Sequence, residues 1–103
     1  MLLFRGALNF EWDEGNHNKN FLGHEVTDQE CEEIFFGPHK FLLKDVVHSD
    51  RESRYILMGE TKQGRRLFVV FTTRKFNVRI ISARDLNKRE RQLYEEAIKN
   101  ENV

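Results

Sequence analysis

Hydrophobic residues are most concentrated in the second half of the chain, where two strand-like runs follow each other closely. The first run is residues 67–71, Leu-Phe-Val-Val-Phe, and its aromatic and β-branched side chains favour a strand. A run this short and this apolar predicts a strand in the middle of a sheet, buried on both faces. The second run is residues 78–83, and the polar link of residues 74–77 is short enough for an antiparallel hairpin.

Two earlier strands are predicted before this hairpin. Residues 39–48 and residues 54–60 have a strand-like composition, and a charged loop of residues 49–53 separates them. A turn at residues 62–64 leads from the second of them into the hairpin. The four runs predict an antiparallel meander of about four strands, and the apolar residues 2–10 are a candidate for a further strand at the edge.

Helices are predicted before and after the meander. Thr27 and Glu30 have the spacing of a capping box, in which each side chain binds the backbone N–H of the other residue. A helix is therefore expected to follow Thr27. An earlier and more weakly patterned helix is expected from about Glu14 to about Leu22, with Asp13 as its N-cap.

The last predicted helix begins after Asn87, an N-cap candidate with Glu90 three residues further on. Its apolar face is expected to consist of Leu93, Tyr94, Ala97 and Ile98. The length of 103 residues favours one domain, residues 1–103. The order of elements predicts an α+β fold, an antiparallel sheet of about four strands with two N-terminal helices and one C-terminal helix.

Charge is distributed unevenly along a chain whose formal net charge is zero. Residues 62–91 contain ten basic residues against Asp85 and Glu90, a net charge of +8, so the remainder carries −8. Five arginines lie in or beside the predicted hairpin: Arg65, Arg66, Arg74, Arg79 and Arg84. Because arginine binds phosphate through several N–H groups, one interpretation is a surface for nucleic acid. The other is a surface whose charges are balanced in three dimensions, and both remain open at this point.

The start of the last helix has the same two interpretations. Lys88, Arg89 and Arg91 place positive charge where the helix dipole is already positive, which is unfavourable unless an anion lies there. A bound phosphate would supply that anion, since the N-termini of helices bind anions. In the second interpretation Asp85, Glu90 and solvent screen the cluster.

Several kinds of site are not indicated by the sequence. The four histidines and the single cysteine lack the spacing of metal ligands, and no phosphate-binding loop, dinucleotide fingerprint or nucleophile elbow is present. We therefore expect no metal and no cofactor. Cys31 follows helical spacing with Ile34 and Phe35 and is expected in the core. The lone cysteine, with no apparent signal peptide or membrane-length apolar run, favours a cytoplasmic protein with no membrane partner.

Several short motifs resemble the BrnT family of toxins from bacterial type II toxin–antitoxin pairs. The most specific is residues 79–84, Arg-Ile-Ile-Ser-Ala-Arg, which is followed by Glu90, Arg91 and Tyr94. The start agrees through residues 10–13, Phe-Glu-Trp-Asp, then Asn20, His24 and Val26. The middle agrees through Glu52, Arg54, Tyr55, Gly59, Gly64, Arg65, Val69 and Val70. Two positions depart from the family pattern, because Asn16 and Gly23 stand where the family commonly has lysine.

This resemblance carries expectations about fold, activity and partners. It implies a RelE-like fold, a small antiparallel sheet with helices at both ends, and a ribonuclease activity that stalls translation. It implies a cognate, BrnA-like antitoxin that neutralises the toxin, and promoter DNA as a partner of the toxin–antitoxin complex only. The site residues that it implies are His24, Arg54, Arg65, Arg79, Ser82 and Arg84.

Chemical roles follow from metal-independent RNA cleavage, in which the 2′-hydroxyl of the substrate is the nucleophile. The protein must orient that hydroxyl, move protons and stabilise the phosphorane. Arg79 and Arg84 are assigned to the scissile phosphate with Arg65 as a helper, and His24 is the candidate proton carrier. Strict alternation would place Arg79 and Arg84 on opposite faces of a strand, so Arg84 is expected beyond the strand end rather than after a bulge. Further RNA contacts are predicted at Arg54, Arg66, Arg74, Lys75, Ser82, Lys88 and Arg89.

A non-catalytic protein is the rival hypothesis. A small interaction module, or a toxin that has lost its activity, would use the same basic face to bind nucleic acid or an acidic partner. His24 has a second interpretation as a residue at a helix end that packs on the domain. Arg54 likewise has a second interpretation as the ion-pair partner of Glu52 or another acid.

Overall fold

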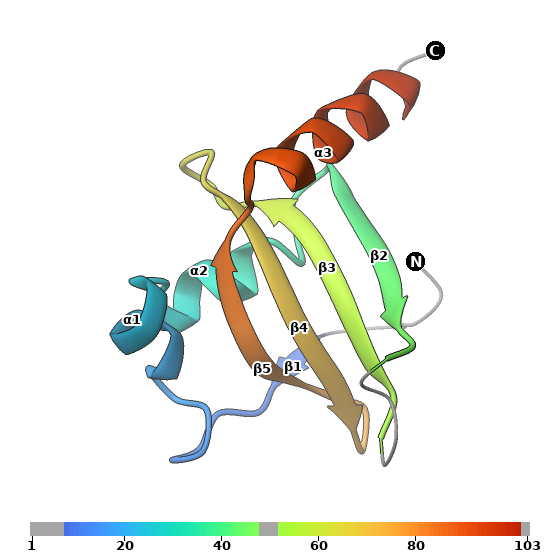
Figure 1. The fold of residues 1–103 in the computed structure, drawn as a ribbon. Coiled ribbons are helices and arrows are strands. Elements are labelled where there is room, and N and C mark those ends of the chain that lie inside the picture. The colour runs from blue at the N-terminus through green and yellow to red at the C-terminus, as the bar shows by residue number, and fades with distance from the viewer. Residues whose placement is uncertain (1–7, 48–51, 102–103) are drawn as a thin grey trace.

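The structure is a computed structural model that describes residues 8–47 and 52–101. Within these residues it contains three helices and five strands (Figure 1). In chain order they are β1 (Asn9–Phe10), α1 (Lys19–His24), α2 (Asp28–Glu33), β2 (Lys40–Asp45), β3 (Arg54–Glu60), β4 (Arg66–Arg74), β5 (Asn77–Asp85) and α3 (Lys88–Glu101). The predicted α+β class is confirmed, as is the placement of two helices before the meander and one after it.

The sheet is mixed, and its five strands have the spatial order β1-β5-β4-β3-β2. β2 to β5 form the predicted antiparallel meander, in which each strand pairs with the next. β1 adds a fifth, short strand that runs parallel to β5. The sheet therefore has one strand more than the predicted four, because the chain before α1 pairs with the outer edge of β5. Parts of three predicted elements lie outside the described residues. They are residues 2–7 of the predicted edge strand, His48 at the end of the predicted strand 39–48, and residues 49–51 of the predicted loop.

One face of the sheet carries the main hydrophobic core. Leu67, Val69 and Phe71 of β4 are completely buried on this face, where they pack with residues of α2 and the segment that follows it. Phe68 and Val70 alternate with them and are only half-buried on the other face. The prediction that β4 is buried on both faces is therefore wrong, because the second face is covered over part of its area only.

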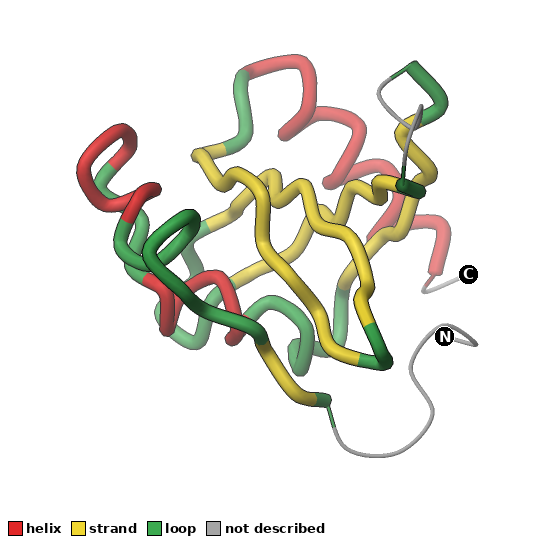
Figure 2. The backbone as a smooth tube through the Cα atoms, turned by 90° about the horizontal axis from the view of Figure 1, so that it is seen from below, coloured by secondary structure: helices red, strands yellow, loops and turns green. Residues whose placement is uncertain are grey.

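α3 provides that partial cover, so helices lie on both sides of the sheet (Figure 2). Tyr94 is completely buried between α3 and the sheet, in a second apolar cluster with Met58 and Leu86. The hydroxyl of Tyr94 donates a hydrogen bond of 2.7 Å to the carbonyl of His39. Leu93, predicted for the apolar face, is instead exposed. That part of the prediction is wrong, because α3 contacts the sheet through a stripe narrower than its apolar residues suggest.

The predicted N-terminal ends of α2 and α3 are both confirmed, each with an N-cap residue three positions before a glutamate. Thr27 Oγ1 accepts from the N–H of Glu30 at 3.1 Å, and Glu30 Oε1 accepts from the N–H of Thr27 at 3.0 Å. At α3, Asn87 Oδ1 accepts from the N–H of Glu90 at 2.8 Å, and Glu90 Oε1 accepts from the N–H of Asn87 at 2.9 Å. These reciprocal bonds satisfy backbone donors that a helix start leaves unpaired.

The first helix begins later than predicted, at Lys19 instead of about Glu14. Asp13 does not cap a helix: it opens a turn in which its carbonyl accepts from the N–H groups of Asn16 and His17. Asn18 follows with a φ of 57°, in the left-handed region, and this residue separates the turn from α1. The prediction of Asp13 as the N-cap of a helix is wrong because the turn that it opens ends before α1; its Oδ1 accepts from the N–H of Gly15 at 2.8 Å while the carboxylate also binds Arg79 of β5.

Candidate functional site

A β-bulge in β5 decides which way the predicted site residues point. The residues paired across the irregularity are Val70 with Ser82 and Phe71 with Ile80. Ile81 is therefore an extra residue on β5, with no counterpart on β4. Beyond the bulge, every side chain of β5 lies on the face opposite to the one that uninterrupted alternation would give it.

The bulge brings Arg79, Ser82 and Arg84 to the same face of the sheet. Arg79 lies opposite Thr72 and Arg84 lies opposite Phe68, and these two residues of β4 share a face because they are four positions apart. β5 continues to Asp85, so the expectation that Arg84 lies past the strand end is wrong. The structure has the bulge, which was the less favoured of the two alternatives considered from the sequence.

A shallow groove of about 430 Å³ lies on this face, between the turn after β2 and the end of β5. Its apolar lining comes from the middle strands and the bulge, and its polar lining comes from both sides. The lining residues are Asp45, Val47, Arg54, Ile56, Phe68, Val70, Ile81, Ser82 and Arg84. Three residues predicted for RNA contact or catalysis, Arg54, Ser82 and Arg84, are thus brought together. The sequence interpretation missed Asp45 and Val47, because only the pairing of β2 with β3 places them here.

Arg84 is the best-placed cation of the groove. Its guanidinium lies 4.1 Å from the centre of the Phe68 ring and binds the Glu90 carboxylate through two bonds of 2.7 Å and 3.0 Å. The hydrogen bond from Arg84 lowers the pKa of Glu90, although burial of that carboxyl acts in the opposite direction. Among the described residues, Nε and one hydrogen of Nη2 of Arg84 have no acceptor, which leaves two donors for a ligand.

Arg79 lies on the same face, towards the other end of β5. Its guanidinium binds Asp13 through bonds of 2.8 Å and 3.0 Å and Glu11 through one of 3.1 Å. The bond from Arg79 is also the main reason why the pKa of Asp13 is lowered. Only 15% of the Arg79 side chain is exposed. Four residues of strand lie between Arg79 and Arg84, so their backbones are roughly 13–16 Å apart, and Asp13 and Glu11 hold the Arg79 guanidinium in place.

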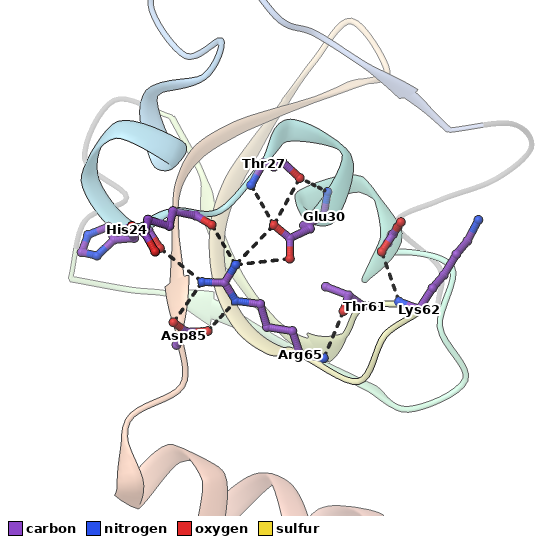
Figure 3. A network of polar contacts seen from close by, with 9 residues as sticks. His24, Thr27, Glu30, Thr61, Lys62, Arg65 and Asp85 are labelled. Carbon is purple, nitrogen blue, oxygen red and sulfur yellow. Dashed lines mark hydrogen bonds and ion pairs between the residues drawn. The ribbon is translucent and has the colours of Figure 1, made fainter.

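Arg65 and His24 form a separate cluster at the end of the hairpin (Figure 3). Arg65 Nε and Nη2 bind the Asp85 carboxylate at 2.7 Å and 3.0 Å, and Nη1 binds Glu30 at 3.2 Å. The remaining donors bind the carbonyls of Glu25 and His24, at 2.8 Å and 3.2 Å. All five N–H donors of Arg65 are therefore engaged. The His24 imidazole points away from this guanidinium and is exposed (Figure 3).

The two clusters meet at Asp85 from opposite sides of β5. The Asp85 carboxylate binds Arg65, and its carbonyl accepts from Nη1 of Arg84 at 3.2 Å. The hydrogen bond from Arg65 lowers the pKa of Asp85, and burial acts more weakly in the other direction. Three of the four predicted catalytic residues, His24, Arg65 and Arg84, thus gather around the β5–α3 junction, while Arg79 lies apart.

The other predicted cations are placed around the rim or outside the groove. Arg66 binds Glu60 at 2.8 Å and Glu95 at 2.9 Å, with its guanidinium 5.1 Å from the centre of the Tyr94 ring. Arg74 binds Glu52 at 3.3 Å. Lys75 at the hairpin turn, and Lys88 and Arg89 at the start of α3, are exposed.

The acids of the chain account for much of the apparent charge asymmetry. Six carboxylates outside residues 62–91 or at its border bind the hairpin arginines, and they are Glu11, Asp13, Glu30, Glu52, Glu60 and Glu95. Glu90 lies at the start of α3 in the place considered for a phosphate, bound to Arg84 and to the N–H of Asn87. Balance in three dimensions therefore explains much of the pattern, although Lys75, Lys88 and Arg89 remain exposed outside the groove.

Cys31 contributes no reactive group to the site. Cys31 is completely buried, and this burial, together with nearby acids, raises its pKa to about 12, as expected for an unreactive core thiol. Over residues 8–47 and 52–101, no group of three or more His, Cys, Asp or Glu side chains has the arrangement of a metal site. No helix within the same residues is long and apolar enough to span a membrane.

Fold and site define a small α+β protein with an arginine-lined groove on the partly open face of its sheet. A family model described as "Ribonuclease toxin, BrnT, of type II toxin-antitoxin system" matches residues 12–90, which is more than three quarters of the chain. The chain therefore belongs to the BrnT family of ribonuclease toxins, as the resemblance of its motifs predicted. A search of curated protein sequences found no match.

Proposed function

We propose that this protein is an endoribonuclease toxin that binds RNA across the groove, cleaves it without a metal ion and thereby inhibits translation. Family membership supports the ribonuclease activity. The observation that carries the location is the groove itself, where Arg54, Ser82 and Arg84 come from two different strands and meet over an apolar floor. Such a floor accommodates a nucleobase, and the arginines at its sides suit the phosphates on either side of that base.

Arg84 is assigned to the scissile phosphate in this proposal. A phosphorane carries more negative charge than the phosphate from which it forms, so a guanidinium fixed before the reaction stabilises it selectively. Stacking on Phe68 and the bonds to Glu90 fix the guanidinium of Arg84, and its two remaining donors suit a phosphoryl oxygen. Arg79 then binds a neighbouring phosphate further along β5, and Ser82 donates a hydrogen bond in between.

His24 and Arg65 support the reaction from the other side of the β5–α3 junction. His24 is proposed as the proton carrier on the strength of its motif; its imidazole is exposed but points away from Arg65 (Figure 3), so it must turn towards the junction to reach RNA bound at Arg84. Arg65 is proposed as a positioning residue that does not itself bind RNA. All its donors are engaged, and through them it positions Asp85 and the α1–α2 turn. A His24→Gln variant is expected to lose the acidic or basic limb of the pH profile for kcat while its fold is retained.

A cognate, BrnA-like antitoxin is the proposed partner, and cytoplasm the proposed location. Leu43, Val46 and Val47 are exposed apolar residues at the end of β2, beside the groove. An antitoxin that covers these residues would bury apolar surface and exclude RNA from the groove at the same time. Promoter DNA is proposed as a partner of the toxin–antitoxin complex only.

The decisive experiment is inducible expression in a bacterium, with and without the adjacent gene. Wild type is compared with the Arg79→Ala/Arg84→Ala variant, and with Lys99→Ala, which removes one positive charge from the exposed last turn of α3. Growth arrest with RNA loss is expected for wild type and Lys99→Ala. The double variant is expected to remain folded and harmless, and the neighbouring gene is expected to rescue growth.

Normal growth and intact RNA with soluble wild-type protein would instead favour a non-catalytic binding module or an inactive toxin. Metal independence is tested with purified protein and a defined RNA in EDTA. Retained cleavage, with 2′,3′-cyclic phosphate ends on the products, is expected if the 2′-hydroxyl is the nucleophile. Loss of cleavage in EDTA that returns with a divalent cation would contradict this part of the proposal.

A further inference from the structure

Two buried asparagines bind the backbone of β5 on either side of its bulge. Asn20 Oδ1 accepts from the N–H of Ala83 at 2.9 Å, and Asn16 Nδ2 donates to the carbonyl of Ile80 at 3.2 Å. Each asparagine is only 3% exposed. The extra residue, Ile81, lies between the two backbone groups that they bind.

These bonds replace backbone pairing that the neighbouring strand does not supply. β1 pairs with the first two residues of β5 only, Asn77 and Val78. Asn16 extends this contact, because Nδ2 also donates to the carbonyl of Glu11 at 2.8 Å and so links the end of β1 to β5. Asn20 provides the next acceptor along the same edge. The asparagine that stands at a family lysine position is thus an internal residue here, with no direct place on the RNA-facing groove.

Asn20 has a feature that packing alone does not explain. Its Nδ2 is buried and has no hydrogen-bond partner among the described residues. An unpaired buried donor is unfavourable, and an apolar side chain of similar size avoids it. The orientation of the Asn20 amide is therefore determined by its other end, the oxygen that binds the N–H of Ala83.

We propose that Asn20 is a positioning residue that fixes the bulge at Ile81 and thereby directs Ser82 and Arg84 into the groove. A bulge that is not fixed can move along the strand, and each one-residue shift sends the side chains that it passes to the opposite face. Arg84 would then leave the Phe68 ring and face the main core side. The inference rests on the proposed function only where it concerns RNA cleavage.

The test compares two replacements of Asn20. Asn20→Leu has a similar volume and lacks the acceptor, whereas Asn20→Asp retains an oxygen for the N–H of Ala83. For Asn20→Leu, kcat for RNA cleavage is expected to fall about 100-fold with little change in KM, because the group displaced acts on the transition state. Asn20→Asp is expected to recover most of that loss.

Thr72→Val is the matched control. Thr72 is similarly buried, and its hydroxyl donates to a backbone carbonyl, that of Ser53, at 2.7 Å; its partner on β5 is Arg79, two positions before the extra residue Ile81. This variant is expected to lose stability while kcat per folded molecule stays within a few-fold of wild type. Equal loss of kcat in Thr72→Val and Asn20→Leu would show that Asn20 acts through general stability, and the inference would be wrong.

A readout that does not need cleavage is provided by NMR. Wild type and Asn20→Asp are expected to protect the Ala83 amide from hydrogen exchange and to show proximity of the Arg84 guanidinium to the Phe68 ring. Asn20→Leu is expected to lose both signals; if it does not fold, Asn20→Ser, whose shorter side chain ends before Ala83, replaces it. Both signals retained in a variant without the acceptor would overturn the inference. If wild type cleaves no RNA, the proposed function fails, and the NMR comparison still decides the role of Asn20.

Discussion

Arg65 and Arg84 lie at the same end of the β4–β5 hairpin and share Asp85, yet their surroundings differ. All five donors of Arg65 bind internal acceptors, two carboxylates and two backbone carbonyls, and 28% of its side chain is exposed. Arg84 binds one carboxylate and one carbonyl, lies on an aromatic ring, and keeps two donors beside the groove, with 37% of its side chain exposed.

The difference shows that the number of arginines near a strand does not by itself define a phosphate site. A phosphate at Arg65 would have to displace a carboxylate that is already well placed, so little binding energy would be gained. A phosphate at Arg84 uses donors that no other described group takes. The capacity to bind a ligand depends on unoccupied donors and on access, and both depend on tertiary contacts.

The largest expected effect comes from Arg84→Ala. Loss of a donor that stabilises the transition state typically lowers kcat about 100-fold or more. Stability should change little, because Glu90 still accepts from the N–H of Asn87. Single-turnover cleavage of a defined RNA, combined with thermal melting, measures both quantities, and Lys99→Ala is the charge-matched control. If Arg84→Ala cleaves RNA as fast as wild type, the assignment of Arg84 to the scissile phosphate is wrong.

Arg65→Ala is expected to have the opposite profile. It removes the bonds of Arg65 to the carboxylates of Glu30 and Asp85 and to two carbonyls, which should lower the free energy of unfolding by roughly 1–3 kcal/mol, although Glu30 keeps its bonds from Thr27. Cleavage per folded molecule, measured well below the melting temperature, should fall less than in Arg84→Ala. The distinction between a structural Arg65 and a catalytic Arg84 would be wrong if Arg65→Ala melts like wild type and loses cleavage to the same extent as Arg84→Ala.

Thr27→Ala is expected to weaken the Arg65 cluster indirectly, with a smaller loss of unfolding free energy than Arg65→Ala. The Thr27 hydroxyl caps α2 and also donates to Glu30 Oε1 at 3.2 Å, so it orients the carboxylate that Arg65 binds. Loss of an N-cap side chain lowers the free energy of unfolding by about 1 kcal/mol. Urea unfolding measures the change, and Thr27→Ser, which keeps the hydroxyl, should remain close to wild type.

The smallest effect is expected in the acid dependence of stability. The hydrogen bond from Arg84 leaves the pKa of Glu90 below its ordinary value of 4.5 in the folded protein. A lowered folded-state pKa stabilises the protein above the unfolded-state pKa, and this contribution disappears as pH falls through the folded-state value. Wild type should therefore lose stability below about pH 4.5 more steeply than Arg84→Ala. Urea unfolding between neutral pH and about pH 3 measures the two slopes, and equal slopes would show that this ion pair contributes nothing.

Both capping boxes were predictable from the sequence because every partner lies within three residues. The Thr27–Glu30 and Asn87–Glu90 boxes each need only a short local segment to form. The first helix was misplaced because Asp13 caps only a short turn, in which its Oδ1 accepts from the N–H of Gly15 while the carboxylate also binds Arg79. Asn18, in the left-handed region, separates this turn from α1, and local propensity did not indicate that break.

The candidate site was predictable as a set of residue types and only partly as an arrangement. Arg54, Ser82 and Arg84 were selected from motifs and do line one groove. Arg65 and Arg79 were selected on the same grounds, but tertiary ion pairs engage them elsewhere. Asp45 and Val47 carried no motif, because their contribution arises from the pairing of β2 with β3.

The sequence by itself determined the α+β class, the β2–β5 meander, two helix starts and the family, because each depends on local composition or on short motifs. Only the tertiary structure decided on which face Arg84 lies. That face depends on one extra residue, Ile81, and on the amide of Asn20, which lies more than sixty positions away from Ala83 in the chain. A strand alternates with a period of two, so a single long-range contact that stabilises a bulge changes the orientation of every side chain after it.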